Sequence, residues 1–538
     1  MGNKNRRSVV HRHPEKNILT KLRDYTILIY LFAVLLVYPL YLENGYYSVA
    51  FGKWKFFLYV TILFLIVMLV CGAASAVRSR GSTLKLVFSG GLLSDKAAGA
   101  YLLLSLVTLW TCENGLAAWM GTEGWYMGLV AQLLFAFLYF SFFLKTPLIR
   151  PLVIFHGIGS ACSFLIALLQ RYGFDLLRLY DGMPDETVRD YLSTLGNRTW
   201  FAGYVCTAFP LGVYFFWKTC EKRELLASGV YVLLSFCCLA TMNTDSVYAA
   251  LFIVFYIILL LSLGSREKMV KFCLLLDGWF VSCFLMSGLR MAFSDAVREL
   301  RSLSCIFLNM RIAAAGLALA MLATGYSLWR QQNGREILKQ RVFALRRLIL
   351  GITAVVIISC ILLIVLNTAG ILERWFGFSI TNSYFLFDDS WGDYRGGTWK
   401  LTVRMIAELP LRQKLFGIGQ DCFAWYAYSN AEYSEILVNT WGSTILANAH
   451  NEWLNQWLCM GLVGGTAYLM IFIFSIRECL KASERKEVSP FVPAVGLCVA
   501  AYVVNDFFGY QQASAAPIIF ILMGSAAGVL KRNPISNK

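Results

Sequence analysis

The sequence is poor in charged residues. They make up 15% of its 538 positions, against about a quarter in soluble globular proteins. It also lacks a P-loop and a dinucleotide-binding glycine fingerprint, and its cytoplasmic loops are too short to hold a nucleotide-hydrolysing domain. Hydrophobic residues supply 58% of the chain, and the mean hydropathy is +0.60. These features exclude a soluble multidomain enzyme and ATP-driven chemistry, and they indicate an integral membrane protein.

Cysteine pairs with metal-binding or redox spacing are also missing. The chain has 15 cysteines but no CxxC motif, and most of the thiols fall within apolar runs, where they pack as small hydrophobic groups. Cys112, Cys305 and Cys422 are expected to face outward, which leaves a disulfide among them open. The acidic stretch 388–393, "DDSWGD", does not have the spacing of a calcium loop. No metal site is expected.

Long apolar runs dominate what is present. About 20 apolar residues span a bilayer as a helix, and fourteen runs are candidates, some of them short enough that 12 to 14 spans are plausible. They cover residues 25–42, 57–77, 97–110, 125–144, 151–169, 201–217, 226–242, 247–263, 272–291, 312–329, 348–365, 453–476, 491–504 and 515–530. We predict an all-α, polytopic helical bundle, with spans 1–11 in residues 25–366 and spans 12–14 in 448–530.

The positive charge indicates how the bundle is oriented. The net charge of +16 is dispersed over short loops, which favours topology control over binding of nucleic acid. If the N-terminus is cytoplasmic, the inner segments contain about two thirds of the 48 Lys and Arg residues, as the positive-inside rule requires. We therefore predict a multi-pass protein of the cell membrane with a basic cytoplasmic N-terminus (1–24) and a cytoplasmic C-terminal tail (531–538).

One outer loop is much longer than the others. It covers residues 367–447, between spans 11 and 12, and amphipathic stretches such as "WKLTVRMIAELPL" predict helices on the outer membrane face. Five cations fall within twenty residues of it: Arg395, Lys400, Arg404, Arg412 and Lys414. Positive charge outside opposes the topology bias, and arginine binds phosphate oxygens bidentately. A diphosphate ligand is one interpretation; a solvated basic face or contact with anionic lipid headgroups is the other.

Histidine is scarce, and one histidine has a position suited to catalysis. The chain has four: His11, His13, His156 and His450. In the predicted topology only His450 faces outward, at the start of span 12, where an imidazole can act as a general base. The alternative is an interfacial histidine that caps a helix. Asp277, in mid-span, is a further candidate, either paired within the bundle or lining a proton path.

The His450 region resembles the signature of the O-antigen ligase and polymerase superfamily. The stretch "AHNEWLNQWLCMGLVGG" provides His450, Asn451, Leu454 and Gly461 at the family's spacing. Upstream, "YRGGTWKLTVRMIAELPLRQKLFGIGQDCF" matches the family pattern at Arg395, Trp399, Pro410, Leu411, Gly417, Gly419 and Phe423. Further back, "LGNRTWFAGYVCTAFPLGVYF" matches another block, and the order of the three blocks agrees.

The sequence departs from the family pattern at two positions. Family members carry Ser-Arg after a short outer turn, whereas Ser246 is followed by Val247 here. The resemblance then implies that another arginine supplies the missing diphosphate contact, with Arg198, Arg404 and Arg311 as the candidates. An acid is usual two residues before the family's glycine, and this chain has Cys459 there.

The resemblance implies a GT-C-like fold and a lipid-linked glycan transferase. The donor would be an undecaprenyl-diphosphate glycan, the acceptor a glycan or lipid-linked glycan, and no metal, nucleotide sugar or other cofactor would be required. Arg395 with Arg404 would bind the donor diphosphate and His450 would take the acceptor proton, while Asn451, Trp399 and Arg198 would bind substrate. Polymerase and ligase remain equally open, because both perform the same transfer to different hydroxyls.

Two other classes are open to a polytopic membrane protein of this size. A polysaccharide flippase or exporter suits fourteen spans, and Asp277 could then serve proton coupling. A flippase needs neither an outer base nor a long outer loop. An oligosaccharyltransferase or mannosyltransferase with an acidic first outer loop is ranked last, because "GYYSVAFGKWKF" contains no Asp or Glu.

Overall fold

The computed structural model describes residues 18–78, 91–144, 148–293, 300–333 and 339–533. The first 17 residues, with His11 and His13, and the last five therefore lie outside the described chain. The structure is 77% helical. One small antiparallel sheet, β1 (Tyr191–Leu192) with β2 (Gly196–Asn197), interrupts the helices of the described part.

Each of the fourteen expected spans coincides with a helix. The first combines α1 (Ile18–Phe32), a π-helical turn (Ala33–Val37) and α2 (Tyr38–Leu40). The others are α3 (Val49–Arg78), α5 (Leu93–Thr111), α7 (Leu129–Leu144), α8 (Ile149–Arg171), α10 (Arg198–Lys218), α11 (Lys222–Thr241), α12 (Asp245–Ser262), α13 (Arg266–Ala292), α15 (Met310–Asn333), α16 (Lys339–Thr368), α22 (Glu452–Lys481), α23 (Phe491–Asp506) and α24 (Ala516–Arg532). Ten helices of the described chain are long and apolar enough to cross a bilayer, and the main part of α7 and the whole of α23 are shorter apolar helices. The polytopic helical fold is confirmed.

Helix α23 lies at the centre of the bundle. It packs against α10, α12, α22 and α24, and all but two of its residues are buried. Small residues let the neighbouring backbones approach, as is usual where helices pack in a membrane. At Gly524 on α24, for example, a Cβ atom would overlap the Tyr139 carbonyl of α7.

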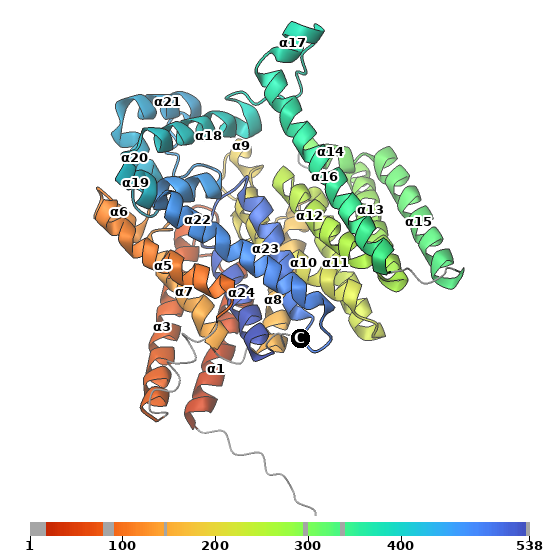
Figure 1. The fold of residues 1–538 in the computed structure, drawn as a ribbon, viewed down its shortest axis with the longest axis horizontal. Coiled ribbons are helices and arrows are strands. Elements are labelled where there is room, and N and C mark those ends of the chain that lie inside the picture. The colour runs from red at the N-terminus through yellow and green to blue at the C-terminus, as the bar shows by residue number, and fades with distance from the viewer. Residues whose placement is uncertain (1–17, 79–90, 145–147, 294–299, 334–338, 534–538) are drawn as a thin grey trace, which may run out of the picture.

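The α13–α15 pair and α16 lie at the edge of the bundle (Figure 1). No residue in the apolar stretch of α16 is buried, as expected of a helix that faces lipid. On α13, the Asp277 carboxylate accepts a hydrogen bond from the Thr324 hydroxyl of α15 at 2.7 Å. Asp277 thus pairs with a neighbouring helix, the first of the two roles expected for it.

The long segment between α16 and α22 is folded. It contains α17 (Ile371–Phe376), α18 (Trp391–Glu408), α19 (Leu411–Phe416), α20 (Phe423–Ser429) and α21 (Ala431–Trp441). We call α18–α21 the cap. It lies at the end of the bundle opposite to the start of α1 and the end of α24 (Figure 1). Leu401, Met405, Phe423 and Leu437 of the cap belong to a hydrophobic cluster that also includes Leu458 and Cys459 of α22.

Backbone hydrogen bonds fasten the cap to α22. Gly461 has a φ of +69° and interrupts α22, which leaves carbonyls of the preceding turn without helical partners. The amides of Ile418 and Gly419 donate to the carbonyls of Leu458 and Cys459, at 3.3 and 3.0 Å. A Cβ atom on Gly461 would overlap the backbone of Leu415–Phe416. Glycine at these positions therefore permits close docking of two backbones.

This docking predicts that Gly461→Ala destabilises the protein. Alanine is strained at a positive φ, and its Cβ also overlaps the cap. We therefore expect the free energy of unfolding to fall by about 1–3 kcal/mol or more. The measurement is the thermal unfolding temperature of the detergent-purified protein. The control is Gly72→Ala on α3, where no atom lies within 4 Å of the added Cβ. Equal unfolding temperatures for the two variants would contradict the docking.

Candidate active site

His450 lies in the turn that joins the cap to α22. Asn451 is the N-cap of that helix, because its side-chain oxygen accepts from the Leu454 amide at 3.0 Å. His450 itself has a φ of +50°, a left-handed conformation that is uncommon for a residue with a side chain. The side chains of two buried asparagines hold this turn. The Asn448 side-chain oxygen accepts from the backbone N–H of His450 (3.0 Å), and that of Asn455 accepts from the backbone N–H of Ala449 (3.3 Å). Asn451 thus positions the helix that follows His450.

Aromatic rings surround the imidazole. Trp441 meets it edge-on at 5.2 Å, and the Tyr510 ring lies 5.1 Å away. The Trp399 indole donates to the His450 carbonyl at 3.4 Å. The imidazole Nδ1 is buried and has no hydrogen-bond partner among the described residues. Burial, reinforced by the positive charge of Arg395, lowers the pKa of His450 to about 3, so the imidazole is neutral at physiological pH.

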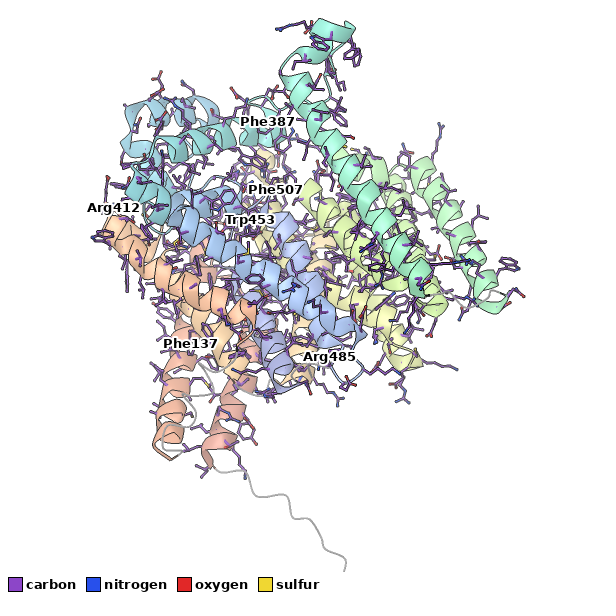
Figure 2. All side chains as sticks on the ribbon, in the orientation of Figure 1. Phe137, Phe387, Arg412, Trp453, Arg485 and Phe507 are labelled. Carbon is purple, nitrogen blue, oxygen red and sulfur yellow. The ribbon has the colours of Figure 1, made fainter. Side chains whose placement is uncertain are left out.

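Trp399 is also part of an aromatic cluster between the cap and α23. Its ring centroid is 5.4 Å from that of Phe507 and 6.2 Å from that of Phe387. Figure 2 shows Phe387 and Phe507 in this region, above Trp453 of α22. The cluster fixes the first turns of α18 against the bundle, and these turns include Arg395.

Arg395 follows three residues with left-handed backbone, Gly392, Asp393 and Tyr394. Its guanidinium donates to two carbonyls, through Nε to Phe508 (3.0 Å) and through Nη1 to Gly392 (2.6 Å). Burial lowers the pKa of Arg395 from its usual value, yet an arginine in this position keeps its charge. The structure therefore brings a partly buried cation near a neutral imidazole.

Arg198 is a second cation at this place. Its charge is among those that act on the Arg395 guanidinium, together with Asp393, Asp245 and Tyr510. Arg198 begins α10, donates to the Asn243 carbonyl at 3.3 Å and forms an ion pair with Asp190 at 3.4 Å. Arg198 and Arg395 come from separate helices and act on one another electrostatically, and Arg395 also acts on His450. We call this pair of arginines the cationic locus.

The structure directs Arg404 elsewhere. It lies nine residues after Arg395 on α18, and its guanidinium pairs with Glu408 and with Glu432 of α21, both at 2.7 Å. Arg404 is partly exposed and fastens α18 to α21. Of the three arginines that sequence reasoning weighed, Arg198 lies beside Arg395, whereas Arg404 faces α21 and Arg311 is exposed at the start of α15.

Sequence reasoning missed Tyr510. It belongs to "NDFFGYQQAS", a polar and aromatic stretch between two apolar helices, which was the available signal. Its hydroxyl accepts from the Trp200 indole at 2.9 Å, and burial raises the pKa of Tyr510 to about 12. Tyr510 therefore stays a neutral phenol against the His450 ring.

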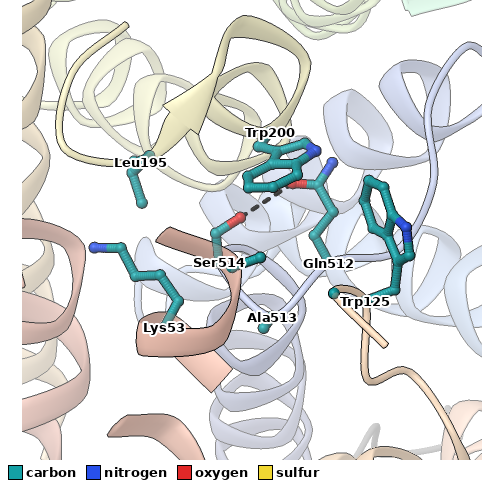
Figure 3. Close-up of a pocket in the computed structure, with 9 residues that line it drawn as sticks. Lys53, Trp125, Leu195, Trp200, Gln512, Ala513 and Ser514 are labelled. Carbon is teal, nitrogen blue, oxygen red and sulfur yellow. Dashed lines mark hydrogen bonds between the residues drawn. The ribbon is translucent and has the colours of Figure 1, made fainter. Parts of the chain in front are cut away.

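Two small pockets adjoin this site. One is lined by Ala50, Lys53, Gly124, Trp125, Leu195, Trp200, Gln512, Ala513 and Ser514. Figure 3 shows Trp125 and Trp200 beside Gln512, which accepts from the Ser514 hydroxyl at 3.1 Å. The Lys53 ammonium donates to the Tyr38 and Pro39 carbonyls at 2.7 and 2.9 Å. The other pocket is polar and is lined by Trp125, Met127, Gln420, Asp421, Asn448, Glu452, Asn455, Gln456, Tyr510 and Gln511.

The acidic stretch 388–393 is partly engaged by neighbouring side chains. Asp389 pairs with Lys400 at 2.8 Å, and Asp388 accepts from Ser390 at 2.8 Å. Within the described residues, no group of three or more His, Cys, Asp or Glu side chains is placed to hold a metal ion.

The fold and the site define a polytopic helical membrane protein with a cap over a cationic, histidine-containing site at one end. A family model described as O-antigen ligase matches residues 300–469, from α14 (Ser302–Phe307) into α22. This segment contains Arg395 and His450, and the match confirms the relationship to the O-antigen ligase superfamily that the motifs predict. The match suggests O-antigen ligase-type glycan transfer in the membrane. No curated protein matches the chain.

Asp421 gives the site region a dependence on pH. Its carboxylate accepts from the Thr122 and Met127 amides, at 2.8 and 3.1 Å, and burial raises the pKa of Asp421 to about 7. The folded state therefore binds this proton more tightly than the unfolded state, in which an Asp has a pKa of about 3.9. The stability that the protonated carboxyl provides is lost as pH rises from about 4 through about 7.

We predict that Asp421→Asn removes this dependence, because an amide oxygen still accepts both amides and does not titrate. The free energy of unfolding of the unmodified protein should fall, relative to the variant, by up to about 1.4 kcal/mol per pH unit between about pH 5 and about pH 7. Thermal unfolding in detergent measures the difference. Asp389→Asn, at an exposed carboxylate, is the control. A difference that is constant with pH would contradict the assignment.

Proposed function

We propose that the protein transfers a glycan from an undecaprenyl-diphosphate donor to an acceptor hydroxyl. The reaction would occur on the outer face of the cytoplasmic membrane, in the synthesis of cell-surface polysaccharide. The observation that carries this proposal is the neutral imidazole of His450, with its Nδ1 buried, near the partly buried guanidinium of Arg395. The same site serves a polymerase or a ligase, because the two differ only in the acceptor.

The proposed reaction is a displacement at the anomeric carbon of the donor. The acceptor oxygen forms the new glycosidic bond while its proton passes to the His450 imidazole. The bond between the anomeric carbon and the diphosphate breaks, and undecaprenyl diphosphate leaves with the electron pair. Arg395 and Arg198 stabilise the negative charge that develops on the leaving group.

Electrostatics supports a link between donor binding and the strength of the base. In the free site the charge of Arg395 contributes to the low pKa of His450. A diphosphate bound at Arg395 and Arg198 offsets that charge, which raises the pKa of the imidazole. His450 would thus become a stronger base once the donor is in place. Trp399 and Asn451 would act as positioning residues, through the His450 carbonyl and the α22 terminus.

We predict that His450→Ala lowers the rate of transfer by about 10²–10⁴-fold, the usual contribution of a general base. The assay is transfer of labelled glycan by the purified protein, together with surface-glycan chain length in cells that carry only the variant. Protein level and unfolding temperature should match the unmodified protein. Unaltered polymer at normal protein level would exclude the role of His450. Movement of labelled lipid-linked glycan across liposomes without transfer would instead indicate a flippase.

A second experiment compares Arg198→Gln with Arg404→Gln. If Arg198 helps Arg395 to bind the diphosphate, its substitution should raise KM for the donor at least about tenfold, a loss of about 1.4 kcal/mol. Arg404→Gln should instead lower the unfolding temperature, because Glu408 and Glu432 lose their partner. Arg412→Gln, at an exposed position on α19, controls for the loss of charge. A larger rise in donor KM for Arg404→Gln would assign the role to Arg404.

We also propose that the cap is extracytoplasmic and that both termini are cytoplasmic. Exposed positions test this with a membrane-impermeant maleimide. Glu435→Cys on α21 should gain label in intact cells. Cys220 is exposed between α10 and α11. Cys220→Ser should label as the unmodified protein does in intact cells and should label less than it once the cells are permeabilised. The reverse pattern would invert the topology.

A further inference from the structure

The polar pocket next to His450 is not used by the reaction as described so far. Four segments line it: the loop 121–128, residues 420–421, the start of α22, and the stretch between α23 and α24. Tyr510 and Asn448 belong to both the pocket and the His450 environment, since Tyr510 packs on the imidazole and Asn448 holds the His450 amide. A group bound in the pocket would therefore lie next to the base.

The lining of this pocket is rich in amides and acids. Its polar side chains are Gln420, Asp421, Asn448, Glu452, Asn455, Gln456, Tyr510 and Gln511, and no Lys, Arg or His lines it among the described residues. Such a lining disfavours a phosphate and suits hydroxyl groups, which both donate and accept. The pocket and the cationic locus of Arg395 and Arg198 thus differ in the chemistry they recognise.

A hydrogen-bond network fixes the orientation of these side chains. The Glu452 carboxylate accepts from the backbone N–H of Gln511 at 2.7 Å and from the side-chain amide of Gln456 at 2.8 Å. Gln511 in turn accepts from Gln132 at 2.7 Å. Because the donors and acceptors are held in advance, a ligand would meet a preformed pattern.

Gln420 leaves one acceptor of this network open. Its side chain is 2% exposed and donates through Nε2 to the Tyr101 hydroxyl at 3.0 Å. Its Oε1 is buried and has no hydrogen-bond partner among the described residues. A buried acceptor without a donor is costly. A hydroxyl group in the pocket would satisfy it.

Trp125 forms an aromatic wall of the pocket. Its ring lies 4.7 Å from that of Tyr510 and 5.4 Å from that of Trp200. Asp421 fastens the loop that carries Trp125. The Asp421 carboxylate accepts from the Thr122 and Met127 backbone N–H groups, and its backbone carbonyl accepts from the Thr122 hydroxyl at 2.9 Å. An aromatic face next to fixed amides and acids suits a sugar ring, which has an apolar C–H face and a rim of hydroxyls.

We propose that this pocket receives a hydroxyl group of an uncharged sugar ring of the glycan substrate, with Gln420 Oε1 as its acceptor and the Trp125 ring against the sugar. The proposal rests on the glycan transfer proposed above. It divides recognition into two parts. The diphosphate goes to Arg395 and Arg198, and the neutral sugar goes to the amide-lined pocket beside His450.

Gln420→Met and Trp125→Ala test the pocket, with Gln413→Met on α19 as the matched control. KM for the glycan substrate should rise at least about tenfold in both pocket variants, with a smaller change in kcat. Donor and acceptor are titrated separately, and the substrate whose KM rises is the one that supplies the sugar. Inhibition by undecaprenyl diphosphate without a glycan should be unchanged in the pocket variants and weakened in Arg395→Lys. Unchanged KM for both substrates in both folded variants would overturn the proposal, as would equal weakening of the glycan-free inhibitor.

A binding experiment separates this proposal from the proposed function. The probe is the free oligosaccharide released by mild acid from the lipid-linked glycan of the host strain. It should raise the unfolding temperature of the unmodified protein and of Gln413→Met, and not that of Gln420→Met or Trp125→Ala. That result would support the pocket even if no transfer were observed. An equal rise in all four proteins, or a rise in none, would overturn it.

Discussion

The arrangement of the site depends on the docking of the turn 417–419 onto the interrupted helix α22. Two backbone hydrogen bonds join them, and a Cβ on either Gly417 or Gly461 would overlap the opposite backbone. The contact holds the cap against the bundle. As a result, α18 presents Arg395 and Trp399 to the turn that carries His450. Gln420 and Asp421 follow the docked turn directly, so the same contact also places the polar pocket and the anchor of the Trp125 loop.

This proximity determines the electrostatics of His450. The imidazole packs against two aromatic rings and lies near the positive charge of Arg395, and both effects favour its neutral form. A base that is neutral but weak in the free site suits a reaction whose donor carries the compensating negative charge. The arginines thus serve two purposes in the proposed reaction, because they bind the diphosphate and their neutralisation on binding strengthens the base.

The spans could be predicted from the sequence because apolar length is a direct physical requirement of the bilayer. His450 and Arg395 could be identified from the topology and the motif spacing, and the structure does bring them together. Tyr510 and the side-chain amides of the pocket could not be identified from the sequence. Gln, Asn and Tyr residues at these positions form no recurring pattern along the chain, and they come together from segments that are far apart in the sequence. Cys459, which replaces a usual acid, acts in the docking through its carbonyl, a role to which side-chain reasoning gives no access.

The packing at the start of α12 favours Arg198 over Arg404 as the second arginine. The family's second arginine would stand at position 247, but Val247 is fully buried in α12 and Ser246 donates to Asn505 of α23 at 2.9 Å. That helix start is therefore committed to packing. Arg198 reaches the turn just before it from α10, with its guanidinium on the Asn243 carbonyl. We therefore propose Arg198 of α10 as the cation that α12 does not supply, whereas Arg404 is engaged by the carboxylates of Glu408 and Glu432.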